Sequence, residues 1–275
     1  MKTSLALLIS FGLGAAGAAQ AQSTWNGAYL GGHAGPSTQS DARGESILFD
    51  TNLDGVFGDT VRTAAGADAF SPGFCGGGAN GPTPASGCRS NGDDDNDDYG
   101  LRLGYDWQDG ALVYGVLGEV ARGGLTDSVT AFSTTPAFYT MRRELETSYA
   151  LRGRVGLSFG DDRNLLYATA GYAWASVRND FSTSNGVNTF VANGDSDASG
   201  AQVGLGYERR IGDAFSVGLE YLRTDFEDED YRVRAQGPAA ATNPFLLVNP
   251  DGTDFRRSNG DIEVESVRLT LNYRF

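Results

Sequence analysis

The chain has 275 residues, a formal net charge of −14 at pH 7 and 39 glycines. This acidic balance argues against nucleic acid as a partner, because a phosphate backbone is bound by clustered lysine and arginine. After the N-terminal segment, no stretch is long and apolar enough to predict a membrane-spanning helix, which needs about 20 apolar residues.

The N-terminal segment has the pattern of a secretory signal peptide. Lys2 gives a short basic start, an apolar stretch covers residues 5–13, and Ala19–Ala21 fits a small-x-small cleavage site. The apolar stretch is too short to anchor the chain in a membrane. We therefore expect residues 1–21 to be a signal peptide and residues 22–275 to be the exported protein.

Eight segments of the exported chain are predicted to be β-strands. In each of them apolar and polar residues alternate with the period of two that a strand requires. In chain order they cover Trp25–Gly35, Tyr99–Gln108, Ala111–Arg122, Thr147–Phe159, Leu165–Asn179, Gly200–Arg210, Phe215–Phe226 and Ile262–Phe275.

Short and long connections alternate between these strands. Asp109–Gly110, Gly160–Asn164 and Ile211–Ala214 are tight connections, and Asp-Gly between alternating runs is a strong hairpin signal. Long polar connections follow the first, third, fifth and seventh strands, and the first of them covers residues 36–98. Short periplasmic turns and long outer loops are typical of outer-membrane barrels, with both termini in the periplasm.

The last ten residues carry the strongest signal for a barrel. An unbroken apolar row, Val267, Leu269, Leu271, Tyr273 and Phe275, alternates with polar residues that include two arginines. A transmembrane β-barrel needs apolar side chains towards lipid and polar ones towards the lumen. Aromatic residues near the predicted strand ends resemble an interfacial girdle: Trp25, Tyr105, Trp107, Tyr207, Phe215, Tyr273 and Phe275. The predicted fold class is therefore all-β, an eight-stranded antiparallel transmembrane up-and-down β-barrel with long extracellular loops.

Short motifs recur in the predicted strands, at 25–32, 104–108, 152–156, 166–172, 218–222 and 273–275. Together they resemble a known family, the alphaproteobacterial porin-like, opacity-type outer-membrane β-barrel proteins. The resemblance implies an eight-stranded barrel in the Gram-negative outer membrane. It also implies that Tyr273 and Phe275 are the assembly signal read by the barrel-assembly machinery. It implies no common biochemical activity, and the long first loop departs from the usual pattern.

Charged residues alternate with the apolar rows and are predicted to face the lumen: Arg102, Asp106, Glu119, Arg152, Arg154, Glu208, Glu220, Arg268 and Arg274. Counting from the periplasmic strand ends places Arg102, Arg152, Arg154 and Arg268 at a depth similar to that of Glu119 and Glu220. Buried charges must be paired, and side chains can just fill an eight-stranded barrel. We therefore predict a salt-bridged, mostly closed lumen. A small passive or gated pore is the alternative.

The first long loop holds a candidate calcium site. The segment Asp50–Gly55 has the D-x-N-x-D-G spacing of calcium loops, in which oxygens at alternating positions converge on one ion. The candidate ligands are Asp50, Asn52, Asp54, the carbonyl of Val56, and Asp59. Val61 stands where an EF-hand has its bidentate Glu, so the alternative is a solvated polar loop. The acidic runs 93–98 and 225–230 are predicted to be solvated loop edges rather than dedicated ion sites. Attraction of divalent cations near lipopolysaccharide and repulsion of anionic neighbours are the alternatives for their role.

Cys75 and Cys88 are the two cysteines, and in an oxidising compartment they are predicted to form a local disulfide. His33 is the single histidine and is predicted to face inward, with no serine motif or paired carboxylates framing it. A lipid-modifying enzyme that uses His33 is one alternative. We predict instead a non-enzymatic protein with a structural or surface-interaction role and no required cofactor, whose partners are outer-membrane lipids and lipopolysaccharide. Ligand, host partner and oligomeric state stay open.

Overall fold

The computed structural model describes residues 25–39, 44–89, 96–228 and 230–275. The predicted signal peptide lies outside these residues. Within them, no helix is long and apolar enough to cross a membrane. The helical segment that the described residues contain is one 3-10 turn, η1 (Pro84–Ser86). The structure is an all-β antiparallel fold, as predicted.

Eight long strands lie among the described residues, and each overlaps one predicted strand. They are β1 (Gly27–Gln39), β4 (Asn96–Asp109), β5 (Leu112–Arg122), β7 (Ala137–Phe159), β8 (Asn164–Thr183), β10 (Ser196–Ile211), β11 (Phe215–Glu227) and β14 (Asp261–Arg274). The tight connections lie where the sequence predicts them, after β4, β7 and β10. We call that side the short-turn end.

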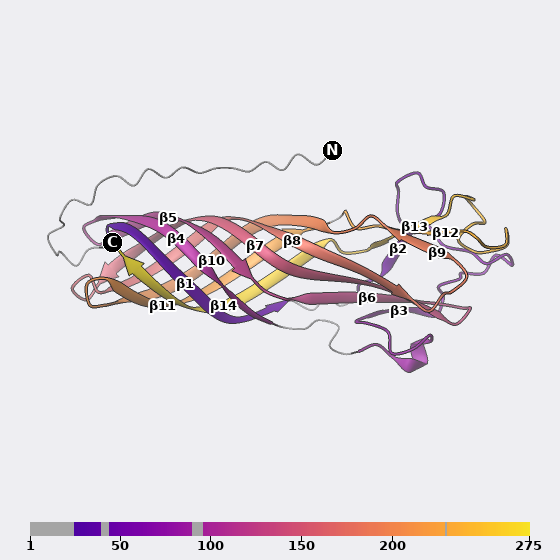
Figure 1. Ribbon diagram of the computed structural model, residues 1–275, viewed down its shortest axis with the longest axis horizontal. Helices are drawn as coiled ribbons and strands as arrows, with labels where there is room; N and C mark the ends of the chain where they lie inside the picture. Colours follow the sequence, from indigo (N-terminus) through magenta and orange to yellow (C-terminus); the bar gives the residue numbers. More distant parts are fainter. Residues whose placement is uncertain (1–24, 40–43, 90–95, 229) are drawn as a thin grey trace.

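The long strands pair side by side in the order β7-β5-β4-β1-β14-β11-β10-β8, and β7 also pairs with β8. Each of the eight described strands therefore has a hydrogen-bonded neighbour on both sides. The first and last of them meet, since Tyr29 lies opposite Arg274 and His33 opposite Thr270. Figure 1 shows these strands together at the end of the molecule that holds the C-terminus.

At the other end, the long connections form a second folded part, which we call the head. It contains the four-stranded sheet β2 (Ile47–Asp50), β13 (Thr253–Arg257), β12 (Val233–Gln236) and β9 (Thr189–Ala192). Beside it, β3 (Gly73–Gly76) pairs with β6 (Thr126–Ser133), which pairs with the outer part of β7. We call the eight long strands the wall. Figure 1 shows β7 and β8 running from the wall into this head. The prediction of polar loops is wrong for these stretches.

The head folds because its connections carry large apolar side chains that pack together. The core includes Ile47, Phe49, Phe70, Val129, Tyr139, Met141, Phe245 and Phe255. Phe49 and Phe255 meet edge to face with ring centroids 5.0 Å apart, and Tyr139 and Phe245 do so at 5.7 Å. Such tilted pairs are favourable beyond their burial.

The wall of long strands has the opposite organisation, with large apolar side chains on its outer face. Leu101, Leu157 and Leu269 are each about 60% exposed, at 62%, 60% and 61%. Soluble monomers rarely expose one contiguous apolar surface of this kind, so the outer face requires an apolar surrounding.

Aromatic residues gather on the outer face near the short-turn end. The rings of Tyr105 and Trp107 lie 4.8 Å apart, and those of Phe215 and Tyr273 lie 5.2 Å apart. Trp25 is a correction to the predicted girdle, because its side chain is fully buried. It precedes β1 and lies on the inner face at the short-turn end, where the guanidinium of Arg274 is 4.7 Å from its ring centroid.

Candidate functional site

The inner face of the wall carries a first group of ion pairs, which we call the central layer. It consists of Arg102, Arg152 and Arg268 with Asp98, Glu119 and Glu220. Strand register brings them together, because Arg102 lies opposite Glu119 on β4–β5 and Glu220 opposite Arg268 on β11–β14. Alternation then points all of these side chains to the same face.

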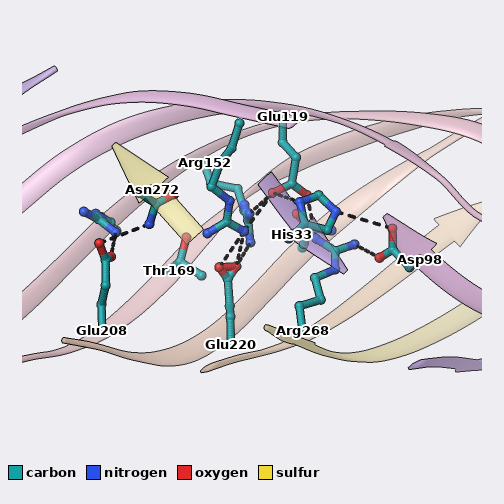
Figure 2. A network of polar contacts seen from close by, with 12 residues as sticks. His33, Asp98, Glu119, Arg152, Thr169, Glu208, Glu220, Arg268 and Asn272 are labelled. Atoms are coloured by element: carbon teal, nitrogen blue, oxygen red, sulfur yellow. Dashed lines mark hydrogen bonds and ion pairs between the residues drawn. The ribbon is translucent and has the colours of Figure 1, made fainter. Parts of the chain in front are cut away.

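The two glutamates of the central layer each bind more than one arginine. Glu119 accepts from Arg102 at 3.0 Å, from Arg152 at 2.7 Å and from Arg268 at 2.5 Å. Glu220 accepts from Arg102 at 3.0 Å and from Arg152 at 2.9 Å. Arg268 also pairs with Asp98. Figure 2 shows these contacts converging from opposite sides of the wall.

A second group, the basal layer, lies nearer the short-turn end and consists of Asp106, Arg154, Glu208 and Arg274. Arg154 donates to Asp106 at 2.7 Å and to Glu208 at 2.9 Å. Arg274 donates to Asp106 at 2.8 Å. Ser216 and Asn272 donate further hydrogen bonds to Glu208.

The depth predicted for Arg154 is wrong. Arg152 lies opposite Leu117 on β5, whereas Arg154 lies opposite Gly115. Two residues of strand move a side chain by about 7 Å, which takes Arg154 out of reach of Glu119 and into the basal layer. Counting residues from the strand ends does not reveal this difference in depth, because neighbouring strands in a tilted sheet are staggered.

Both layers are balanced in formal charge. The central layer pairs three arginines with three carboxylates, and the basal layer pairs two with two. All ten of these residues are at most 8% exposed. A buried charge is tolerated when it is paired and its remaining polar atoms are bonded.

Apolar side chains lie beyond both layers on the inner face. Towards the short-turn end, Trp25 packs with Val113, Leu165 and Tyr167. Towards the head lies a larger cluster: Leu125, Leu145, Ala150, Ala173, Ala175, Val177, Ala198, Phe226, Ile262 and Val264. A cavity of about 40 Å³ lies beside the central layer, and Gln202 and Arg268 are among its lining residues.

His33 lies within the central layer, which the sequence did not indicate. Its Nε2 is 3.5 Å from Asp98 and its Nδ1 is 3.6 Å from Glu119. The imidazole is buried, and neither nitrogen makes a hydrogen bond to a described residue. Asp98, assigned from sequence to a solvated acidic run, therefore faces inward and joins the network, since β4 begins at Asn96 rather than Tyr99.

A third buried ion-pair group lies in the head, and sequence reasoning missed it. Arg257 binds Glu45 at 2.7 Å and Asp127 at 2.5 Å, and Arg143 binds Asp127 at 2.7 Å. Burial raises the pKa of the Glu45 carboxyl above its usual range, against the opposite effect of the Arg257 guanidinium. No alternation of apolar and polar residues in the sequence identifies these four residues as buried.

The candidate calcium segment forms a tight loop after β2. Asp50 is buried, and its carboxylate accepts from the backbone nitrogens of Asp54 at 3.2 Å and Gly55 at 2.8 Å. Asn52 accepts from the nitrogen of Asp54, and Asp54 from that of Val56. Asp59 binds Thr51 instead. Within the described residues no group of three or more His, Cys, Asp or Glu is placed to hold a metal, and calcium binding stays a prediction.

The predicted disulfide is present. Cys75 on β3 is bonded to Cys88 with their Cα atoms 6.4 Å apart, and no free cysteine is found in the described chain. The bond holds the segment with η1 against β3, at the edge of the head. Of the two acidic runs, residues 93–95 and 229 lie outside the described residues.

The sequence model of the outer membrane protein beta-barrel domain matches residues 4–275. The chain belongs to this family. It is 32% identical over 130 residues to a 22 kDa outer membrane protein of Rhizobium leguminosarum, which is 46% of this chain and 52% of that protein. It is 25% identical over 177 residues to the 31 kDa outer-membrane immunogenic protein of Brucella melitensis, which is 64% of this chain and 65% of that protein. The chain thus spans about half and about two thirds of these relatives.

Two solved structures align with this chain at low similarity. The attachment invasion locus protein Ail of Yersinia pestis aligns over 91% of this chain and 99% of its own, with a TM-score of 0.35 and 9% identity. The outer membrane protease OmpT of Escherichia coli aligns over 90% and 97%, with a TM-score of 0.43 and 8% identity. Family and relatives place this protein in the Gram-negative outer membrane.

Proposed function

We propose that the protein is a non-enzymatic outer-membrane barrel with a closed lumen and a folded head that acts as an interaction surface outside the cell. In this proposal the eight long strands close into one barrel and cross the membrane. The short-turn end then faces the periplasm and the head faces outward. The exposed apolar belt of the wall supports the orientation of the strands in lipid.

The proposal of a closed lumen is supported by the order of the layers along the inner face. From the short-turn end these are an apolar floor with Trp25, the basal layer, the central layer and the larger apolar cluster with Phe226. Every arginine in the two ion-pair layers binds at least two groups, so opening a path means separating charges that lie out of water. Separating one buried pair costs about 3–5 kcal/mol.

Liposome swelling tests this proposal directly. Purified protein reconstituted into liposomes is expected to give the same swelling rate with a small sugar as protein-free liposomes. A non-specific porin reconstituted in parallel is the positive control. Swelling above the protein-free rate that scales with the amount of folded protein would refute a closed lumen.

A gated pore is the second candidate function, and one observation favours it. The cavity of about 40 Å³ beside the central layer has polar groups in its lining, including Gln202 and Arg268, next to apolar ones such as Phe226. If the central layer is the gate, Glu220→Gln weakens it by removing one negative charge and opens a conductive state. Conductance in planar bilayers that appears with this variant, and is absent without it, would identify the gate.

An enzyme using His33 is the weaker candidate. The imidazole is buried and lies between two carboxylates that also bind Arg268, so a substrate would have to displace ion pairs to reach it. Release of fatty acid from outer-membrane lipid by purified protein, lost in His33→Ala, would establish this function in place of the proposed one.

A further inference from the structure

The outer face of the wall holds an apolar groove along β1. At most levels this face carries Leu, Val or an aromatic ring, but the outward residues of β1 above Leu30 are Gly32 and Ala34. Gly32 lies between Leu101 of β4 and Leu271 of β14, and Ala34 lies between Tyr99 and Leu269. Each small residue thus has a large side chain on both sides at its own level, which leaves a channel along the strand.

The groove has a volume of about 650 Å³ and is almost wholly apolar, with walls that include Leu101, Val120, Leu269 and Leu271. The packing of the protein does not require glycine at 32. A Cβ there would meet the carbonyl oxygen of Gly100 at 3.4 Å and Leu101 at 4.0 Å, which is ordinary contact. The hollow is therefore a property of the outer surface and is not imposed by the strands behind it.

A single cation stands at the end of the groove nearest the head. Arg122, the last residue of β5, lines the groove, lies opposite Tyr99 and is exposed. No ion pair or hydrogen bond joins it to another described residue. Arg223 on β11, also outward near the head, is bound to Glu263 at 2.8 Å. Asp97, two residues beyond Tyr99, stands further from the apolar groove than Arg122 does.

We propose that this groove binds a phosphorylated, multiply acylated lipid of the outer leaflet, lipid A, with an acyl chain over Gly32 and Ala34 and a phosphate at Arg122. The inference rests on the proposed orientation, which puts the head end of the wall in the outer leaflet. An acyl chain matches an apolar channel, and an unpaired guanidinium at its mouth matches a phosphate. A second copy fits less well, because a two-fold contact would place one hollow against the other.

Lipid retention tests the proposal. The protein is extracted in mild detergent, incubated with purified diphosphoryl lipid A, washed, and analysed by native mass spectrometry. Arg122→Gln is expected to weaken lipid A binding about tenfold, the effect of losing a hydrogen bond to a charged group. Gly32→Leu with Ala34→Leu is expected to abolish it by filling the channel. Lipid A without phosphates should bind to the unaltered protein as weakly as diphosphoryl lipid A binds to Arg122→Gln.

Two matched controls keep the test specific. Arg223→Gln removes an outward arginine that is already paired, and Ala168→Leu adds the same side chain to the outer face of β8, between Val155 and Leu205. Both should bind lipid A like the unaltered protein, and heat-modifiability should show that every variant is folded. Equal binding by the groove-filled variant would overturn the proposal. A dimer that the same substitutions abolish would assign the groove to a second copy. Liposome swelling would refute the closed lumen without changing lipid A retention, so the two failures are distinguishable.

Discussion

The wall and the head are built from one chain but turn opposite kinds of side chain outward. The wall turns leucines outward and encloses arginines and carboxylates, whereas the head encloses phenylalanines and turns polar residues outward. The solvent explains the difference. Lipid accepts apolar side chains, so the charged rows must be enclosed and paired, while water around the head restores the usual order. An apolar side chain of β7 is therefore expected to face outward where the strand lies in the wall and inward where it lies in the head.

The largest effect is expected from the end of the wall. Tyr273→Ser with Phe275→Ser removes two outward rings whose centroids lie 5.1 Å apart at the C-terminus. If these rings are the signal that the barrel-assembly machinery reads, most of the protein is expected to be lost from the outer membrane. Immunoblots of heat-modifiable protein in outer-membrane fractions measure this. Phe74→Ser, in the head and 40% exposed, is the control and should leave the level unchanged.

The next effect distinguishes buried charge in the wall from charge in the head. Glu220→Gln leaves Arg102 and Arg152 short of one partner inside the wall, and we expect a loss of about 3–5 kcal/mol in the free energy of unfolding. Asp254→Asn breaks the pair with Arg234, whose side chain is 38% exposed, and should cost about 1 kcal/mol or less. Urea unfolding followed by tryptophan fluorescence gives both values. Equal losses would contradict the distinction.

A third substitution tests whether the head unfolds independently of the wall. Phe255 is fully buried and packs against Phe49, and its truncation to Ala should cost the head about 3–5 kcal/mol. We expect limited proteolysis to cleave the head while the wall keeps its heat-modifiability. Val191→Ala, at a side chain 51% exposed, is the matched control. A parallel loss of stability in the wall would show that both parts unfold as one unit.

The smallest effect concerns calcium at the loop after β2. A site without the twelfth-position Glu is expected to bind weakly, with a Kd of about 10⁻⁴–10⁻³ M. Calcium should protect residues 47–61 from proteolysis, and Asp50→Ala with Asp54→Ala should abolish the difference between calcium and chelator. That difference is the quantity to measure, since Asp50 also holds the loop through backbone hydrogen bonds. Equal digestion in calcium and chelator would reduce the motif to a polar turn.

The sequence was most informative where the period of two is unbroken. Every predicted strand has a counterpart within a few residues, except that β7 and β8 continue into the head. The head was missed because its core residues come from separate connections, Phe49 and Phe70 from the one after β1 and Phe245 from the one after β11. No local period marks residues that pack only in three dimensions.

The alternation of polar and apolar residues predicts which charged side chains face inward, but it does not predict their partners. Arg154 moved to the basal layer because register depends on the stagger between strands, which the sequence of one strand does not contain. His33 and Asp98 were judged one at a time, and their proximity depends on the pairing of β1 with β4. The fold was therefore more predictable than the site.

The continuity of β7 and β8 has a mechanical consequence. Residues 137–146 of β7 extend past the end of β5, which is about 30 Å of strand. β6 and β8 both pair with this part of β7, so the head is joined to the wall through continuous hydrogen-bonded strands. A register shift between Leu145 and Thr147 lies where β7 passes from the wall into the head. In the proposed orientation, large molecules that approach the bacterial surface would meet the head before they reach the lipid.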